Sequence, residues 1–284
     1  MVLDKTNNMK FLLQLALLIC STMTLHAQNA PSTIISTQEN LQESFKTVPC
    51  KSEERFEAVK NLFLKMGAKP AEIIVEKFDK DKISNITVTK KGKTEETIIV
   101  GAHYDKVSEG CGAVDNWTGI AIIAHLYKTL NSIDTQKTYI FVAFDQEEKG
   151  LLGSDAMAKA IPKEKRLQYC SMVNFDSFGF SSPFILRNPS TPKMIEIAKN
   201  IAKESGFKMI DVEIAGSDAD STSFKKRDIP AVTFSGLDND WQNIIHTGND
   251  KSEKIKPVSV YFGYRFGLAF LANLDENICR EQKK

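Results

Sequence analysis

An excess of charge of either sign is missing from this chain of 284 residues, in which 37 lysines and arginines face 36 aspartates and glutamates. The net charge of +1 gives no electrostatic basis for binding nucleic acid or an anionic membrane surface. Internal repeats, low-complexity runs and linkers rich in Pro, Gly or Ser are also absent. These absences favour a single globular domain over several domains joined by linkers.

Cysteine is scarce too, with five residues. One of them, Cys20, lies in an N-terminal segment that we expect to be removed, and the other four are Cys50, Cys111, Cys170 and Cys279. Four cysteines allow three different pairings, and free buried thiols are equally consistent with the sequence. A domain of this size with so few cysteines is no disulfide scaffold, so its apolar core must supply most of the stability.

Residues 1–27 are expected to form a secretory signal peptide. Lys10 precedes an apolar run over residues 11–20, and Ala27 is a small residue suited to cleavage before Gln28. A basic start, a short apolar core and a small residue at the cut are typical of exported proteins. Because the run is too short for a membrane span, we expect a secreted or periplasmic protein with no span after cleavage.

The rest of the chain alternates between helical and extended patterns. Residues 28–48 are polar without strong periodicity and are expected to form a loosely held N-terminal arm before a domain over 49–284. The predicted helices cover 52–66, 118–130, 151–159, 192–205, 221–226 and 258–273. The predicted strands cover 72–78, 84–90, 97–102, 138–144, 171–175, 212–215 and 230–235. This order predicts one α/β domain with a central mixed, mostly parallel sheet flanked by helices on both faces.

Polar residues gather where several predicted strands end. His103 and Asp105 follow the strand over 97–102, and Asp115 lies in the next loop. Ligands of such sheets bind outside the carboxyl ends of the strands. We therefore expect these side chains to contribute to one site.

Two adjacent carboxylates, Glu147 and Glu148, follow the strand over 138–144. An isolated acidic pair is more often a polar strand end that leads into a helix. Here Asp176 follows another strand and His246 comes from a late loop, so the pair is not isolated. One carboxylate of such a pair can bind a cation while the other handles protons beside it.

Histidine is also scarce, with four residues, of which His26 lies in the expected signal peptide. His103 and His246 lie where carboxylates gather, whereas His125 lies among apolar residues of a predicted helix and is expected to be packed inside the protein. Histidine and carboxylate ligands without cysteine suit zinc in a catalytic site. Two histidines and several carboxylates are enough for a pair of cations that share one bridging carboxylate.

Five motifs, in this order, closely resemble the metal motifs of the M28 family of di-zinc aminopeptidases. They are Gly101-Ala102-His103-Tyr104-Asp105, Gly112-Ala113-Val114-Asp115-Asn116-Trp117-Thr118-Gly119, Phe144-Asp145-Gln146-Glu147-Glu148-Lys149-Gly150-Leu151-Leu152-Gly153-Ser154, Asn174-Phe175-Asp176 and His246-Thr247. The resemblance extends over about residues 50–275. It implies the zinc aminopeptidase fold, which is phosphorylase/hydrolase-like, with two zinc ions as cofactors.

The resemblance also implies a role for each metal-binding residue. Asp115 is similar to the carboxylate that bridges both zinc ions. His103 and Asp176 would complete the ligands of one ion, and Glu148 and His246 those of the other.

Three further features follow from the same resemblance. Glu147 is similar to the general base, and Asp105 resembles the carboxylate that orients His103. The family also implies a cis peptide bond after Asp115. The resemblance fails in one segment, where Ser221 stands in place of a frequent histidine and Asp228 in place of a glycine.

The function implied is that of a zinc-dependent exopeptidase that removes N-terminal residues from peptides by metal-activated water, with Glu147 as the base. Three alternatives stay open: a glutaminyl-cyclase-like acyltransferase with a single zinc, an M28-type carboxypeptidase, and a peptide-binding protein with a relict site. The zinc content and the end of the peptide that is cleaved distinguish the enzymes. The complete set of ligands argues against a relict.

Overall fold

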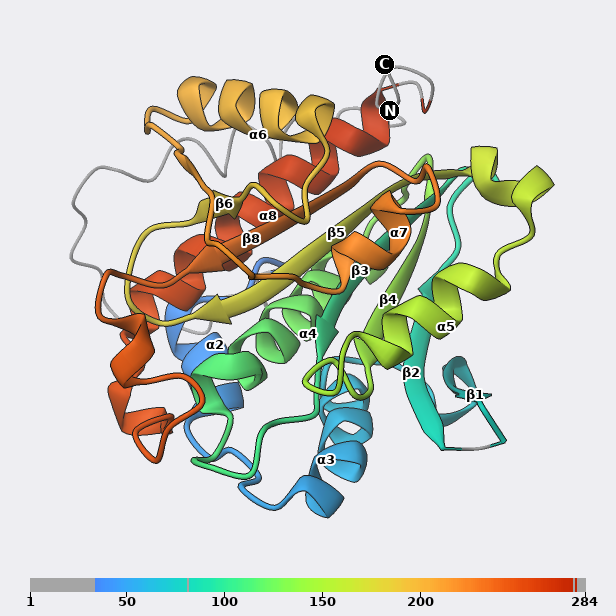
Figure 1. Ribbon diagram of the computed structural model, residues 1–284. Helices are drawn as coiled ribbons and strands as arrows, with labels where there is room; N and C mark the ends of the chain where they lie inside the picture. The colour runs from blue at the N-terminus through green and yellow to red at the C-terminus, as the bar shows by residue number, and fades with distance from the viewer. Residues whose placement is uncertain (1–33, 81, 278, 280–284) are drawn as a thin grey trace, which may run out of the picture.

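A mixed sheet of eight strands lies at the centre of the computed structural model, which describes residues 34–80, 82–277 and 279 (Figure 1). In the described chain the strands are β1 (Ile73–Phe78), β2 (Ile83–Lys90), β3 (Thr97–His103), β4 (Thr138–Phe144), β5 (Tyr169–Phe178), β6 (Phe184–Leu186), β7 (Asp211–Val212) and β8 (Ala231–Gly236). Their order is β1-β2-β4-β3-β5-β8-β6-β7. The central strands β4, β3, β5 and β8 are parallel, while β2 and β6 run antiparallel to their central neighbours, which confirms the predicted architecture.

Helices cover both faces of the sheet. They are α2 (Gln38–Phe45), α3 (Ser52–Lys65), α4 (Thr118–Asn131), α5 (Leu152–Ala160), α6 (Pro192–Glu204), α7 (Ser221–Lys225) and α8 (Pro257–Glu276). Figure 1 shows α5 and α7 in front of the sheet and α8 behind it. The helices α2, α3, α4, α6 and α8 pack together on that second face and bury the larger of two apolar clusters.

The strand β3 forms the middle of the sheet and ends at the first predicted metal ligand. All seven of its residues are buried, as expected for a parallel strand with helices on both faces. Gly101 allows the Phe144 ring to lie against β3, since a Cβ at residue 101 would be 2.4 Å from that ring. The register then pairs His103 with Phe144, so β3 and β4 end at the same edge of the sheet.

The prediction of a loosely held arm over residues 28–48 is wrong for its described part, residues 34–48. The side chain of Thr37 caps α2, and the helix buries Leu41 and Phe45 against α4 and α8. The apolar residues of α2 are too few to show periodicity, and its packing depends on partners that are distant in the sequence. The expected signal peptide, residues 1–27, lies outside the described residues.

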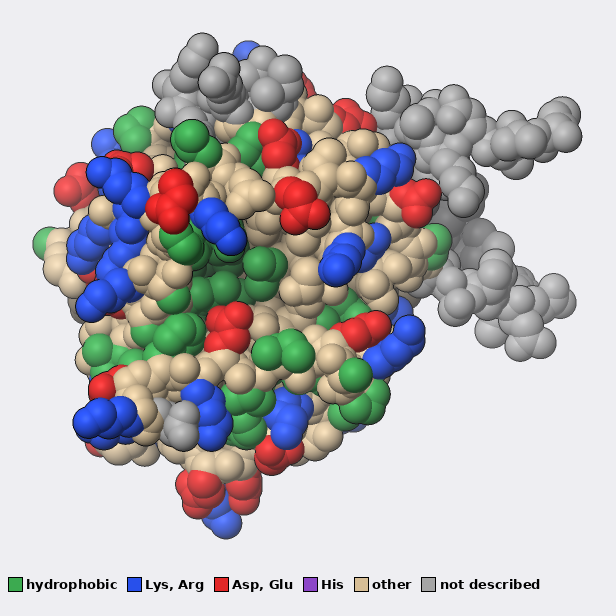
Figure 2. All heavy atoms as spheres, turned by 90° about the vertical axis from the view of Figure 1, so that its right-hand side faces the viewer, with side chains coloured by type: hydrophobic (Ala, Val, Ile, Leu, Met, Phe, Trp, Pro, Cys, Tyr) green, Lys and Arg blue, Asp and Glu red, His purple; other side chains and the backbone are tan. Residues whose placement is uncertain are grey.

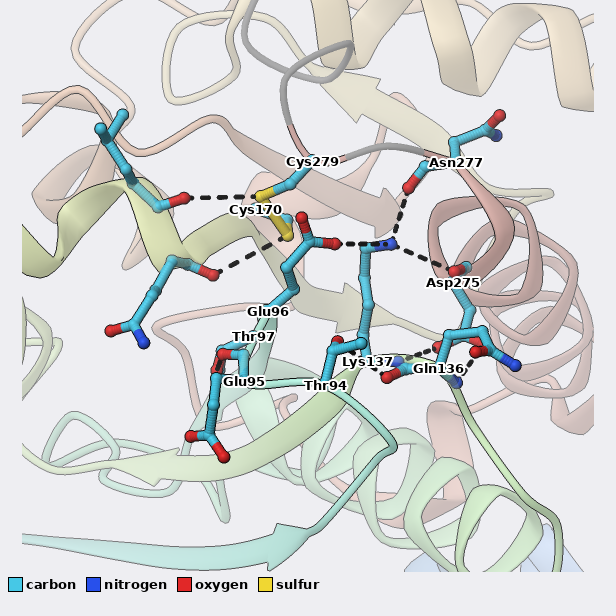
Figure 3. Close-up of a disulfide and its surroundings, with 12 residues drawn as sticks. Thr94, Glu95, Glu96, Thr97, Gln136, Lys137, Cys170, Asp275, Asn277 and Cys279 are labelled. Atoms are coloured by element: carbon cyan, nitrogen blue, oxygen red, sulfur yellow. Dashed lines mark hydrogen bonds and ion pairs between the residues drawn. A yellow bond between two sulfur atoms is a disulfide. The ribbon is translucent and has the colours of Figure 1, made fainter.

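Two disulfides join distant parts of the chain. Of the three possible pairings, the structure has Cys50 bonded to Cys111 and Cys170 bonded to Cys279. The first ties the start of α3 to the loop after β3. The second ties the start of β5 to the segment after α8 (Figure 3).

The surface carries charges of both signs. On the face that includes β1 and α5, basic and acidic side chains lie side by side around a shallow hollow of apolar side chains (Figure 2). Across the part of the chain that the structure describes, none of the helices combines the length and the apolar character needed to span a bilayer.

Candidate metal centre

The ends of three neighbouring strands bring most of the predicted site residues together. His103 is the last residue of β3, Asp176 lies in β5 beside it, and Glu147 and Glu148 follow β4 on its other side. Two loops supply the others, with Asp115 just before α4 and His246 before α8.

Asp115 lies at the middle of the cluster, with one carboxylate oxygen directed at each histidine. Its Oδ1 is 3.0 Å from His103 Nε2 and its Oδ2 is 3.1 Å from His246 Nε2. Glu148 Oε2 is 3.0 Å from His246 Nε2, and Asp176 Oδ1 is 3.7 Å from His103 Nε2. The structure thus groups His103 with Asp176 and His246 with Glu148, and both groups share Asp115.

The two remaining predicted residues lie beside these groups. Glu147 Oε2 is 4.0 Å from His103 Nε2. Asp105 Oδ1 is 3.3 Å from His103 Nδ1, on the opposite side of the ring. The carboxylate of Asp105 also accepts hydrogen bonds from the backbone N–H groups of Glu147 and Glu148, at 3.0 and 3.2 Å. Asp105 therefore lies against the Nδ1 side of the His103 ring and fixes the turn that carries both glutamates.

The electrostatics of the cluster favour positive charge at both histidines. Hydrogen bonds to Asp115 and Glu148 raise the pKa of His246 to about 10. Burial lowers the pKa of His103, but Glu147 and the aspartates around it outweigh that effect and raise it well above its usual range. Burial opposes the ionisation of Asp115 as well, yet its hydrogen bonds with the two histidines hold its pKa below the usual range.

Burial raises the pKa of Glu147 well above its usual range and raises that of Glu148 as well, because ionised carboxylates lose hydration inside a protein. Within the described residues, Glu148 Oε1 is buried and has no hydrogen-bond partner. A site with five carboxylates around two histidines has more acidic than basic groups. A bound cation would offset this charge and provide a partner for the unpaired oxygen.

The backbone around Asp115 contains a cis peptide bond and is held by the side chain of Asp250. The peptide bond between Asp115 and Asn116 is cis, as the family resemblance implies. The carboxylate of Asp250 accepts hydrogen bonds from the N–H groups of Val114, at 2.6 Å, and Asp115, at 3.2 Å. Asp250 was not among the predicted site residues, although its place four residues after His246 was a usable signal.

Asp220 is a buried carboxylate near the site. Neither of its oxygens has a hydrogen-bond partner among the described residues, and burial raises its pKa to about 7. Beside it, Ser221 is also buried, and its hydroxyl lies 2.6 Å from Thr233 Oγ1 and donates to Pro189 O. Asp228, the second position at which the resemblance fails, has a φ of 60°, a left-handed conformation that aspartate tolerates.

Comparison with known families covers the part of the chain that forms this centre. The model of peptidase family M28 matches residues 85–261, which is more than half of the chain. The chain belongs to peptidase family M28. The match includes every predicted site residue, from the end of β3 to the loop before α8.

Individual M28 relatives are distant. Aminopeptidase YwaD of Bacillus subtilis is 28% identical over 201 residues, which are 66% of this chain and 44% of the Bacillus protein. This chain therefore spans less than half of that relative. Among solved structures, the LapA aminopeptidase of Legionella pneumophila has a TM-score of 0.73 and 16% identity, covering 92% of this chain and 79% of LapA. A glutaminyl cyclase from an Acidobacteriales bacterium has a TM-score of 0.72 and 19% identity, covering 90% of this chain and 99% of the cyclase. At these identities the two structures show a shared fold.

Proposed function

We propose that this M28 protein is a zinc aminopeptidase that holds two zinc ions and removes N-terminal residues from peptides. The observation that carries the proposal is the geometry of Asp115, whose two oxygens each approach a different histidine. A carboxylate placed in this way is suited to bridge two cations. The two groups on either side provide each cation with a histidine and a further carboxylate.

Zinc fits this set of ligands. Imidazole nitrogens and carboxylate oxygens are its usual ligands in catalytic sites, which keep at least one position for water or substrate. Two zinc ions, when bound, supply a water of lowered pKa and polarise the scissile carbonyl. His103 is held for ligation through Nε2, because Asp105 lies against Nδ1.

Glu147 is suited to act as the base. Its Oε2 is 4.0 Å from His103 Nε2, whereas Asp115 and Glu148, which are predicted ligands, each lie 3.0 Å from a histidine nitrogen. The carboxylate of Glu147 is therefore left available for proton transfer. Burial raises its pKa, and the cations proposed for the site would lower it again toward the ionised form that a base requires. We infer that Glu147 takes the proton of the attacking water and returns it to the leaving amine.

A second candidate is acyl transfer as in a glutaminyl cyclase with one zinc ion. The observation that favours it is the solved cyclase, 99% of whose length this chain covers. We prefer the aminopeptidase because the described residues provide two groups of ligands around Asp115. YwaD, whose name describes an aminopeptidase, also matches at a higher identity than the cyclase.

The test is to purify the protein, measure its zinc content by mass spectrometry and assay it on aminoacyl-nitroanilides and on peptides with an N-terminal glutamine. We expect two zinc ions per chain and amine release that a chelator abolishes and added zinc restores. One zinc ion with cyclisation of the glutamine peptide would establish the cyclase instead. Cleavage of a peptide with a blocked N-terminus at its C-terminal end would establish a carboxypeptidase. Two zinc ions with no turnover of any substrate would support the peptide-binding alternative.

We also propose that the protein is exported to the periplasm or the medium. The pattern of residues 1–27 supports this, and so do the two disulfides, which form in oxidising compartments. N-terminal sequencing of the protein from its own host should begin at Gln28. A cytoplasmic protein that retains residues 1–27 would contradict the proposal.

A further inference from the structure

Arg55 is a fully buried arginine in the first half of α3, outside the set of predicted ligands. Its guanidinium lies over the ring of Trp117, with Cζ 5.0 Å from the ring centroid. Burial lowers its pKa to about 10, so it remains a cation at neutral pH. Among the described residues no ion-pair contact of Arg55 with a carboxylate is found, so a conventional salt bridge does not explain its burial.

The hydrogen-bond partners of Arg55 are backbone carbonyls. Its Nε donates to Tyr104 O, the carbonyl next to His103. Its Nη1 donates to Cys111 O at 2.9 Å, and its Nη2 donates to Gly112 O at 3.2 Å. Nη1 also donates to Pro49 O, at 3.2 Å.

Three of these four carbonyls belong to the two segments that carry predicted ligands. Tyr104 follows His103 directly, and Gly112 lies three residues before Asp115. One planar guanidinium therefore joins both segments, and its several N–H donors in a fixed plane are what such a junction requires. Gly112 has a φ of 58°, and a Cβ there would lie 3.2 Å from Arg55 Nη1. The backbone at residue 112 therefore passes close to the guanidinium.

Arg55 donates to carbonyl groups of the loop before α4, and Asp250 accepts hydrogen bonds from N–H groups of the same loop. Besides the two N–H groups bound by its carboxylate, its backbone O accepts from Cys111 N at 2.8 Å. The loop over 111–115 is thus held on one side by a buried cation and on the other by a carboxylate from the His246 loop. Asp115 has little freedom to move between these two supports.

We propose that Arg55 is a positioning residue for the metal centre, which sets the distance between His103 and Asp115 by fixing the backbone of both segments. The proposal rests on the proposed metal function. A positioning role and a purely electrostatic role of Arg55 predict opposite changes in the affinity for the cation. Removing a positive charge near the site would tighten cation binding, whereas removing a positioning residue weakens it.

The test compares Arg55→Lys and Arg55→Met with the parent and with a matched control, Arg265→Lys. Arg265 on α8 also lies over an aromatic ring, that of Tyr261, and donates to Tyr261 Oη one turn away on the same helix. The readouts are zinc dissociation constants from competition with a chromophoric chelator, the visible spectrum of the cobalt(II)-loaded protein, and thermal unfolding of the metal-free protein.

We expect zinc to bind about 10–100-fold more weakly to Arg55→Lys, which keeps the charge but not the planar donors. Arg55→Met should weaken binding at least as much, although it removes a positive charge. Both should change the cobalt spectrum, and Arg265→Lys should not. Metal-free Arg55→Lys should still unfold cooperatively.

Unchanged or tighter zinc binding in folded Arg55→Lys would overturn the proposal. Loss of folding in Arg55→Lys would also overturn it, because Arg55 would then be a general stability residue. If only Arg55→Met fails to fold, the zinc affinity of Arg55→Lys decides the question. Fewer than two zinc ions on the parent would contradict the two-zinc function separately. The change in affinity for any ion that binds would still test Arg55.

Discussion

Glu147 and Glu148 are neighbours in the chain, but their carboxylates have different partners. Glu148 Oε2 contacts His246 at 3.0 Å, whereas Glu147 Oε2 is 4.0 Å from His103. Both backbone N–H groups are held by Asp105. The turn after β4 thus directs the Glu148 side chain toward His246 and leaves that of Glu147 beside His103, which is consistent with the proposed division between ligand and base.

Glu147→Gln tests the base at the scale of one residue. Glutamine has the shape of the glutamate side chain but accepts no proton at neutral pH, so we expect kcat to fall by about 10²–10⁴-fold. The zinc content should remain that of the parent, because Glu147 is not a proposed ligand. Near-full turnover in Glu147→Gln would show that another group is the base.

Asp115→Asn tests the bridge. The amide replaces one oxygen with a nitrogen that donates hydrogen bonds and removes the charge shared by both proposed cations, so both should bind more weakly. We expect a loss of affinity above about 100-fold for at least one ion, since changes to groups behind the ligands already cost about 10–100-fold. Equilibrium dialysis followed by metal analysis measures it. Two ions bound as tightly as in the parent would contradict the bridging role.

His125 of α4 joins this helix to α2. Its side chain is 1% exposed, as expected for a packed histidine. Its Nδ1 lies 2.7 Å from Ser36 Oγ and its Nε2 lies 2.9 Å from Ser44 Oγ. Burial, with smaller effects of Lys128 and Lys65, lowers the pKa of His125 to about 3.

This burial makes the attachment of α2 sensitive to acid. Between pH 6.5, the ordinary pKa of histidine, and pH 3, the unfolded chain binds a proton at residue 125 that the folded chain excludes. Stability therefore falls as the pH falls, by about 2 kcal/mol at pH 5 from this group.

His125→Gln removes the titrating group and keeps polar atoms near both serines. We expect the variant to lose about 2 kcal/mol less than the parent between pH 7 and pH 5, even if it is less stable at pH 7. Urea unfolding of the zinc-loaded proteins at both pH values measures the difference, and the other histidines contribute equally to both proteins. Parallel pH dependences would contradict the prediction.

At the scale of the molecule, the Cys170–Cys279 disulfide connects segments 109 residues apart. The buried Lys137 lies beside it and donates to Asp275 O at 3.1 Å and Asn277 O at 2.6 Å (Figure 3). Its Nζ is also 3.2 Å from Glu96 Oε2. The end of α8 is therefore held both by a covalent bond and by a buried cation.

The double variant Cys170→Ser, Cys279→Ser tests the covalent part. We expect the free energy of unfolding to fall by about 2–5 kcal/mol, because the bond restricts the unfolded chain, and Lys137 should keep α8 docked. The kcat of the folded variant should equal that of the parent, since the disulfide lies at the opposite end of β5 from Asp176. Denaturant unfolding and turnover are the measurements. A loss of turnover per folded molecule would show that the two ends of the sheet are coupled.

Where the apolar periodicity of a segment determines its secondary structure, the sequence was sufficient to predict the element. The run over 97–102 became β3 with one added residue, and the pattern over 118–130 became α4 with a nearly exact match of its ends. The metal motifs predicted which residues meet, because the ends of parallel strands lie at one edge of the sheet. The short strand β6 and the helix α2 were not predicted, because each contains too few apolar residues to show a period.

The sequence by itself determined the α/β architecture and the composition of the candidate centre, since both depend on apolar periodicity and on which residues follow each strand. Only the tertiary structure decided the disulfide pairing, the docking of α2 and the supports behind Asp115. Arg55 illustrates the reason: it lies four residues before Val59 on the buried side of α3, where sequence shows only a misplaced charge. Three of its four carbonyl partners lie 49 to 57 residues away, and backbone groups are the same in every sequence, so only folding reveals which of them it binds.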